Sequence, residues 1–441
     1  MKHLLGEDSE AFLKALASAT PVSIRLNPEK LILMSEDKVN WCRYGYYLSE
    51  RPVFTLDPLF HAGAYYVQEA SSMFIEQIII QLGLDKKPVR ALDVCAAPGG
   101  KTTHLLSLLP NESLIVSNDV IKSRIPVLRE NIIKWGNANC VITNNDSADF
   151  NSLENFFDLV VCDAPCSGEG LFRKDIDAIS HWSPEHVEFC SARQKRIVSA
   201  VWNSLKSGGI FVYCTCTYNE QENEEVIGWI NAQCTMHNAQ LKIIASDILI
   251  SEKNEISFYR FYPHKIYGEG FCISVMKKEG IYNTAAGKIK KEKIIFTSEK
   301  HLNILSSWIH QPERFEFIQN GPDIMMLHKE HLPDYLYLKK NLKIGYAGTR
   351  IALIKGTGIQ PAPELAFCHH LNQNIFKRCN LSKTDALRYL KGATDFSFEA
   401  NEGYYLMLYE NIPLGFAKKT GNRFNNLFPR EWYIRMEIRH Q

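Results

Sequence analysis

Two cysteines and an acid stand where the sequence predicts the ends of buried strands. Asp163 and Cys166 follow an apolar run at residues 157–162, and Cys216 closes a second run at residues 210–216. Open α/β sheets bind ligands at the carboxyl ends of their parallel strands. A thiol held there beside a helix start or a basic residue is partly ionised to the nucleophilic thiolate. Either cysteine alone would be read as a buried structural residue, but together they predict two thiols facing each other across a ligand cleft.

A row of acids at strand ends indicates the type of cofactor. Asp119 ends the second expected strand, Asp146 follows the third and Asp163 ends the fourth, close to the loop Ala96-Ala-Pro-Gly-Gly100. An acid after the second strand suits a ribose, and the glycines let the backbone approach a nucleoside closely. The loop lacks the G-x-G-x-x-G spacing of dinucleotide sites, and Gly99-Gly-Lys-Thr102 lacks that of a phosphate loop. We therefore expect a ligand with adenine and ribose but no phosphate, of which S-adenosylmethionine is the common example.

The twelve cysteines do not follow a metal-binding pattern. There is no C-x-x-C pair, and Cys214 and Cys216 are too close in sequence for a zinc clip. Cys95, Cys162 and Cys214 lie singly in apolar runs, as reduced buried thiols do. The N-terminus has acids where a signal peptide is apolar, and no run approaches the ~18 apolar residues of a membrane span. We expect a cytoplasmic protein without a metal or a membrane segment.

Alternating apolar runs and helical segments between residues 89 and 216 must position these side chains. This alternation predicts an α/β fold with a parallel, doubly wound sheet and right-handed crossovers. A glycine pair, Gly208-Gly209, is expected to cap the helix before the last of these strands. The expected parallel strands lie at residues 89–95, 114–119, 139–143, 157–163 and 210–216, with an antiparallel pair at 258–263 and 270–276.

Flanking regions divide the chain into four expected parts. The first holds an aromatic segment at residues 41–47, which we interpret as core and turn in preference to a base-stacking surface. A long helix is expected at residues 65–80, and a polar linker at 288–293. The expected domains are an α+β N-terminal region at 1–75, the sheet domain at 76–280, a middle domain at 281–363 and a β-rich module at 364–441.

The net charge of +1 hides an uneven distribution of charge along the chain. Residues 281–441 carry 23 Lys and Arg against 15 Asp and Glu, so the preceding residues are acidic overall. A basic C-terminal third on an acidic body favours contact with a polyanion. On charge alone a solvated surface is the alternative.

Three ordered motifs carry a resemblance to a known family. Asp93-Val-Cys-Ala-Ala-Pro-Gly-Gly-Lys-Thr102, Asp163-Ala-Pro-Cys-Ser-Gly-Glu-Gly170 and Tyr213-Cys-Thr-Cys-Thr-Tyr-Asn-Glu-Gln-Glu-Asn-Glu224 resemble the Nop/Sun family of RNA 5-cytosine methyltransferases. The resemblance spans nearly the whole chain and is greatest to the bacterial RsmF (YebU)-like branch, including its PUA-like C-terminal module. It implies a Rossmann-like class I S-adenosylmethionine methyltransferase sheet. Cys214 is a departure, because a serine often precedes Thr-Cys in the family.

The resemblance also implies a role for each motif residue. Cys216 would attack C6 of cytosine, and Cys166 would help to remove the C5 proton so that the product is released. Asp163 would contact the N3/N4 edge of the base, with Lys101 as a second base contact. The base would have to be unpaired or flipped out to reach them. The implied cofactor residues are Cys95, Ala96, Ala97, Pro98, Gly99, Gly100, Lys101, Asp119, Arg124, Asp146 and Asp163.

The substrate implied by the resemblance is small-subunit (16S) ribosomal RNA, either free or in the 30S subunit. Transfer RNA is the alternative substrate for the same chemistry. DNA cytosine methylation is disfavoured, because that family uses its Pro-Cys as the nucleophile and lacks the Thr-Cys. A non-catalytic RNA-binding assembly factor would require degraded motifs, whereas all three are intact here. We expect a monomer.

Overall fold

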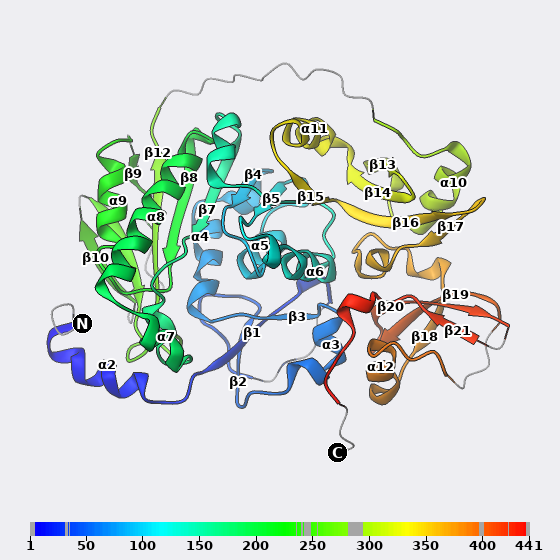
Figure 1. The fold of residues 1–441 in the computed structure, drawn as a ribbon, viewed down its shortest axis with the longest axis horizontal. Helices are drawn as coiled ribbons and strands as arrows, with labels where there is room; N and C mark the ends of the chain where they lie inside the picture. Colours follow the sequence, from blue (N-terminus) through cyan, green and yellow to red (C-terminus); the bar gives the residue numbers. More distant parts are fainter. Residues whose placement is uncertain are drawn as a thin grey trace.

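The computed structural model of the 441-residue chain describes residues 5–30, 34, 36–234, 236–239, 241, 248–253, 255–280, 294–396, 401–421 and 423–437. The linker expected at 288–293 lies outside these residues. A ten-stranded mixed sheet runs through the centre of the molecule, with smaller sheets beside it (Figure 1). No helix among the described residues is both long and apolar enough to span a membrane.

Five parallel strands form the middle of the large sheet, in the order β6-β5-β4-β7-β8. Antiparallel strands extend it on both sides, and the strand order reverses at β4, which places the ligand edge between β4 and its neighbours. The predicted Rossmann-like α/β fold is confirmed. The parallel strands are β4 (Arg90–Asp93), β5 (Leu114–Asn118), β6 (Cys140–Thr143), β7 (Phe157–Asp163) and β8 (Leu205–Thr215), and the antiparallel ones are β12 (Phe271–Lys278), β11 (Ile256–Phe261), β10 (Leu249–Lys253), β9 (Met236–Asn238) and β15 (Ile344–Ala347).

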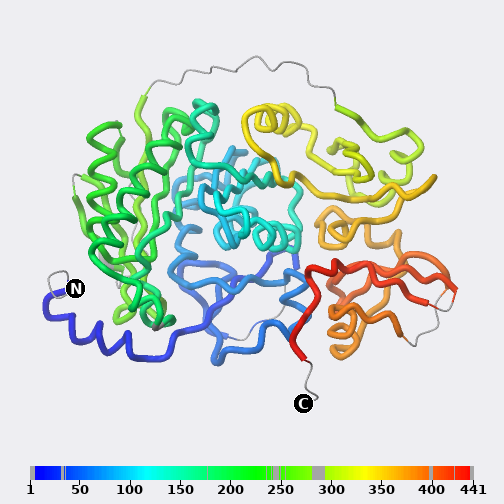
Figure 2. The backbone as a smooth tube through the Cα atoms, viewed as in Figure 1, coloured from blue at the N-terminus to red at the C-terminus, as the bar shows by residue number. Residues whose placement is uncertain are grey.

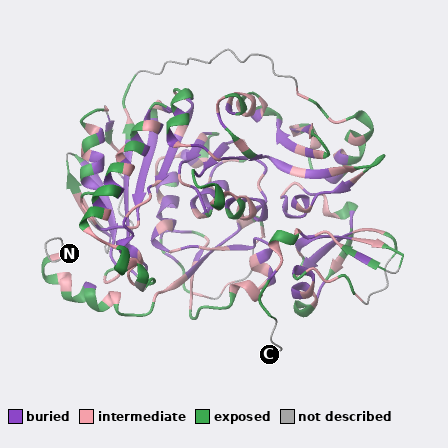
Figure 3. Cartoon of the chain, viewed as in Figure 1, coloured by how far each residue is buried: buried purple, intermediate pink, exposed green. Residues whose placement is uncertain are grey.

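Helices cover both faces of the sheet, because successive strand residues point to opposite sides. On β7, Leu159 and Val161 join the core formed with one layer of helices, whereas Val160 and Cys162 join the core on the other face. Figure 3 shows the strands buried and the outer helix faces exposed. The first layer holds α4 (Ile75–Gln81), α5 (Gly100–Leu108) and α6 (Ile125–Trp135), and the second holds α8 (Pro184–Trp202) and α9 (Glu224–Asn231), with α7 (Ile176–His181) before them.

Two local predictions are wrong. Residues 65–80 do not form one helix: Tyr65–Val67 is strand β3, and the α-helix begins at Ile75. The Tyr-Tyr-Val sequence favours a strand and pairs with β1, which overrides the helical spacing. Gly208-Gly209 does not cap a helix either, because α8 ends at Trp202 and both glycines lie inside β8.

The N-terminal region is a small α+β unit. Helix α2 (Ser9–Leu16) precedes a three-stranded sheet of β2 (Gly45–Leu48), β1 (Val22–Leu26) and β3, and α3 (Pro58–His61) lies between β2 and β3 in sequence. Trp41 is buried and donates its indole N–H to the carbonyl of Ala70 at 2.7 Å. For this residue the aromatic segment is therefore core, as interpreted from the sequence.

The C-terminal part contains two four-stranded sheets that pack against the body. Strand β15 leaves the middle region and joins the edge of the large sheet beside β6, so the two regions share one sheet. Helix α3 packs against α12 and β20 of the last module. Figure 2 shows the blue N-terminal part of the chain next to the orange and red C-terminal part. The domain boundaries given above stay predictions. The elements are α10 (Glu299–Trp308), β13 (Phe315–Asn320), β14 (Asp323–His328), α11 (Leu332–Asn341), β16 (Thr349–Lys355), β17 (Gly358–Pro361), β18 (Lys377–Asn380), α12 (Lys383–Leu390), β19 (Gly403–Tyr409), β20 (Ile412–Thr420) and β21 (Arg423–Asn426).

Candidate active site

The two predicted thiols lie together at the carboxyl edge of the sheet. Cys166 follows β7 and Cys216 directly follows β8, and these neighbouring parallel strands bring their Sγ atoms to 3.1 Å. Both residues are half-buried and not disulfide-bonded. The hydrogen bond with Cys216, together with burial, raises the pKa of the Cys166 thiol well above its ordinary value. The two sulfurs therefore meet at one point of the sheet edge, close enough to share a hydrogen bond.

Hydrogen bonds between the loops fix this separation. The backbone N–H of Gly170 donates to the carbonyl of Cys216 at 2.7 Å. The Glu169 carboxylate accepts the backbone N–H of Tyr218 at 3.1 Å. A side chain at position 170 has no room, because its Cβ would lie 2.4 Å from the carbonyl oxygen of Gly270 and 2.8 Å from that of Cys216. The glycine thus permits the close approach of the two cysteine loops.

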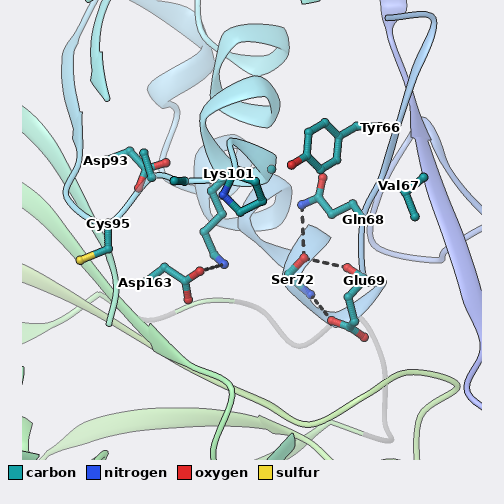
Figure 4. Close-up of a pocket in the computed structure, with 13 residues that line it drawn as sticks. Tyr66, Val67, Gln68, Glu69, Ser72, Asp93, Cys95, Lys101 and Asp163 are labelled. Atoms are coloured by element: carbon teal, nitrogen blue, oxygen red, sulfur yellow. Dashed lines mark hydrogen bonds and ion pairs between the residues drawn. The ribbon is translucent and has the colours of Figure 1, made fainter. Parts of the chain in front are cut away.

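A pocket of about 230 Å³ opens at the carboxyl edge of the sheet, between the ends of β4 and β7 and the loop before α5. In Figure 4, Asp93 and Cys95 lie on one side of Lys101, and Tyr66 and Gln68 lie on the other. Of the predicted cofactor residues, seven line the pocket. Its full lining is Tyr66, Val67, Gln68, Glu69, Ser72, Asp93, Cys95, Ala96, Ala97, Pro98, Gly100, Lys101 and Asp163.

An ion pair connects the pocket to the cysteine loops. Lys101 Nζ, on the first turn of α5, lies 2.7 Å from Asp163 Oδ2 at the end of β7. Burial opposes the charge on Lys101, but the nearby carboxylate of Asp163, with Cys214 and Asp93, raises its pKa above the ordinary value. The ammonium is thus charged, while 39% of the Asp163 side chain remains exposed. Asp163 can reach a ligand while paired.

Asp93 is a pocket residue that was not among the predicted site residues. Its Oδ2 accepts the hydroxyl of Thr102 at 2.7 Å, whereas its buried Oδ1 has no hydrogen-bond partner among the described residues. Burial raises the pKa of Asp93 to about 7. The signal was available in the sequence, because Asp93 ends the first parallel strand just as Asp163 ends the fourth. Tyr66, Gln68, Glu69 and Ser72 were also missed, because a helix was expected there.

Four predicted cofactor residues and both predicted catalytic thiols lie outside the pocket lining. Gly99 caps α5 with a φ of 116°, which favours glycine. Asp119 is buried and accepts the backbone N–H of Ala97 at 3.3 Å, while Arg124 pairs with Asp119 at 3.2 Å and donates to the Ala97 carbonyl. Asp146, after β6, pairs with Arg196 at 3.0 Å. Asp119 and Arg124 thus hold the backbone of the loop at residues 96–100 through Ala97.

The pocket suits a cofactor with a cationic amino-acid end and a nucleoside. The unpartnered Asp93 oxygen and the half-exposed Asp163 offer acceptors, and the turn at residues 95–98 presents backbone groups. The strand order and this site define the class of protein: an S-adenosylmethionine-dependent methyltransferase.

Comparison with known proteins identifies the family. Residues 81–277 match the family model of the 16S rRNA methyltransferase RsmB/F, residues 1–70 the N-terminal domain of 16S rRNA methyltransferase RsmF, and residues 376–434 the PUA domain of methyltransferase RsmF. The chain is 30% identical to ribosomal RNA small subunit methyltransferase F of Pectobacterium atrosepticum, over 90% of this chain and 84% of that one. The same protein of Escherichia coli O6:H1 is 30% identical over 89% and 84%. The chain therefore belongs to the RsmF family of RNA methyltransferases, and the resemblance is confirmed.

Solved structures agree with this assignment. A methyltransferase homolog from Pyrococcus horikoshii is 30% identical with a TM-score of 0.52, covering 62% of this chain and 91% of that one. NSun6 from Pyrococcus horikoshii, solved with SFG, is 21% identical with a TM-score of 0.51, over 64% and 97%. The second likeness establishes the fold.

Proposed function

We propose that this enzyme methylates C5 of cytosine in small-subunit (16S) ribosomal RNA through a covalent intermediate. The chemistry rests on one observation, the 3.1 Å separation of the Cys166 and Cys216 sulfurs at the ends of neighbouring strands. C5 of cytosine is a poor nucleophile until a thiolate adds to C6, and the added thiolate must later be expelled. Two thiols at one place suit these two steps. The names of the relatives support the RNA substrate.

Cys216 acts as a thiolate that bonds to C6 and makes C5 nucleophilic. Bound S-adenosylmethionine would supply an electrophilic methyl group to C5 and would leave as S-adenosylhomocysteine. In the release step the C5–H bond breaks, its electron pair restores the C5–C6 double bond, and the C6–S electron pair returns to Cys216. Cys166, in its thiolate form, takes the proton. The thiol with the raised pKa suits this role, because its thiolate binds a proton tightly.

Asp163 and Lys101 link the base to the cofactor. Asp163 contacts the N3/N4 edge of a flipped-out cytosine, since part of its side chain is free while Lys101 holds the rest. Lys101 is the second base contact. The residues that contact the cofactor are Cys95, Ala96, Ala97, Pro98, Gly100, Lys101 and Asp163. The cofactor loop is held in place by Gly99, Asp119 and Arg124. Asp146 lies at the same edge of the sheet, after β6.

The roles of the two cysteines can be distinguished by whether each variant forms a covalent protein–RNA adduct. Cys166→Ala should block release, so a protein–RNA adduct should accumulate and migrate slowly on a denaturing gel. Cys216→Ala should abolish the adduct and lower methylation at least ~1000-fold, as for loss of a nucleophile. Cys379→Ala, a half-buried thiol on β18 in the last module, is the control. Absence of the adduct in Cys166→Ala, or retained activity in Cys216→Ala, would overturn the roles.

Bisulfite sequencing of RNA from a deletion strain and its parent tests the substrate. We expect one cytosine of 16S rRNA to be methylated in the parent and unmethylated in the deletion strain, whether the enzyme acts on free 16S rRNA or on the 30S subunit. A changed cytosine in transfer RNA would replace that substrate, and no changed cytosine would favour a non-catalytic assembly factor. We further propose that the enzyme acts as a cytoplasmic monomer.

A further inference from the structure

A buried carboxylate beside the thiol pair has no role in the reaction described so far. Glu222 lies between β8 and α9 and is 0% exposed. Its Oε2 accepts the backbone N–H of Ser167 at 2.9 Å and the amide of Gln194 at 2.8 Å, while its Oε1 accepts the Ser167 hydroxyl. Every one of these donors belongs to the surroundings of Cys166. The carboxylate is therefore directed at the release thiol's loop.

Gln194 bonds both to Glu222 and to the residue that precedes Cys166. This fully buried residue of α8 donates its side-chain amide to the carbonyl of Pro165 at 3.1 Å as well as to Glu222. The residues before and after Cys166 are thus both tied to one pair of side chains. We call Glu222 and Gln194 the Cys166 clamp.

The clamp also reaches the loop of the other thiol. The Ser167 hydroxyl lies 3.2 Å from that of Thr217, which follows Cys216. The hydroxyl of Tyr213, on β8, donates to the backbone carbonyl of Glu222 at 2.6 Å, so the clamp is anchored to the strand that delivers Cys216. The contact with the Cys216 strand thus uses the backbone carbonyl of Glu222, whereas its side chain bonds, among the described residues, only to groups around Cys166.

Burying a carboxylate costs free energy that an apolar residue would not. Burial raises the pKa of Glu222, because the charged form is less stable away from water. The bonds it receives satisfy the group, and a satisfied buried network fixes a single geometry. What the network fixes here is the segment from Pro165 to Ser167, and the side chain at its centre is Cys166.

We propose that Glu222, held by Gln194, is a positioning residue that aligns Cys166 for the release step. The inference rests on the proposed function. In that step the C5 proton passes to the Cys166 thiolate as the C6–S bond breaks and Cys216 leaves as a thiolate. The alignment required is that of Cys166 Sγ with the C5 proton, whereas addition of Cys216 to C6 does not use Cys166 as a base. Loss of the clamp should therefore slow release more than addition.

Single-turnover kinetics with Glu222→Gln tests this difference. Adduct should form at close to the wild-type rate and disappear at least tenfold more slowly, with the KM for S-adenosylmethionine unchanged. Gln194→Met keeps the length of the side chain, removes both bonds and should slow release in the same direction. Glu225→Gln makes the same charge change three residues along, at an exposed position of α9, and should behave as wild type.

A double variant distinguishes failure of the inference from failure of the proposed function. In Cys166→Ala, where the release thiol is absent, adding Glu222→Gln should change adduct lifetime less than twofold. If Cys166→Ala accumulates adduct but neither clamp variant does, the clamp has no role in release and the proposed function stands. If the double variant slows release a further tenfold, Glu222 does not act through Cys166. If Cys166→Ala accumulates no adduct, the proposed function itself fails.

Discussion

The charges of the pocket are set by three of its lining residues, Lys101, Asp163 and Asp93. Lys101 is paired with Asp163 and also lies near the second carboxyl, Asp93, which burial keeps from ionising readily. Burial raises the pKa of Asp93 to about 7, so this carboxyl is partly protonated near neutral pH. A neutral carboxyl with an unpartnered oxygen can become charged when a cationic group enters the pocket.

Asp93 should make the stability of the protein depend on pH. Its pKa is about 7 in the folded chain against an ordinary value of 3.8, so its stabilising proton is fully bound below pH 3.8 and lost as pH rises through 7. Between pH 5 and 8 the wild type should lose about 2.5 kcal/mol more than Asp93→Asn. The apparent midpoint of thermal unfolding should then fall by roughly 3 °C more in the wild type.

Asp177→Asn, an exposed acid on α7, is the control for this measurement and should follow the wild type. The comparison between variants matters, because other buried groups also titrate in the range and affect both proteins equally. Equal declines in the wild type and Asp93→Asn would contradict the assignment of a raised pKa to Asp93.

At the scale of elements, the site depends on the distance between the ends of the neighbouring strands β7 and β8. Apolar runs in the sequence predicted β7 and β8, and their parallel pairing was enough to predict that Cys166 and Cys216 would meet. The hydrogen bonds that set their separation come from side chains such as Glu222, which lie in loops without periodicity. Loops of this kind carry no pattern from which their partners can be predicted.

Gly170→Ala should disturb this spacing without touching a reacting group. The added Cβ would meet the carbonyls of Gly270 and Cys216 at 2.4 and 2.8 Å, so one of the loops must move. We expect a stability loss of about 1–3 kcal/mol from overpacking and a fall in methylation of about 100-fold or more. Gly358→Ala is the matched control, since its Cβ would meet nothing nearer than 3.9 Å. Full activity of Gly170→Ala would show that the loops tolerate a different spacing.

At the scale of the whole molecule, the regions around the catalytic sheet interlock with it. Strand β15 completes the sheet from the middle region, which the sequence did not predict because its pairing with β6 joins residues about two hundred positions apart. Residues 364–367 are buried, and Glu364 among them pairs with Arg129 of α6 at 3.3 Å. A deletion beginning at residue 364 would therefore remove core residues as well as basic ones, and charge substitutions are the better test of the basic C-terminal third.

Exposed cations on the PUA domain should contribute to RNA binding through their charge. Lys377 and Arg378 on β18 and Arg423 on β21 are exposed, so their replacement by glutamine should leave the fold intact. Each phosphate contact to a single strand releases counterions worth about 0.7 in the slope of log K against log salt, so the triple variant should lose about 2 from that slope. Binding to a 16S rRNA fragment, measured by filter retention at several salt concentrations, gives the slope directly.

The control is a triple variant of the methyltransferase domain, Lys86→Gln, Lys87→Gln and Lys253→Gln, which removes equal charge from exposed positions. Equal slopes for the two triple variants would mean that the PUA cations do not contact the RNA backbone.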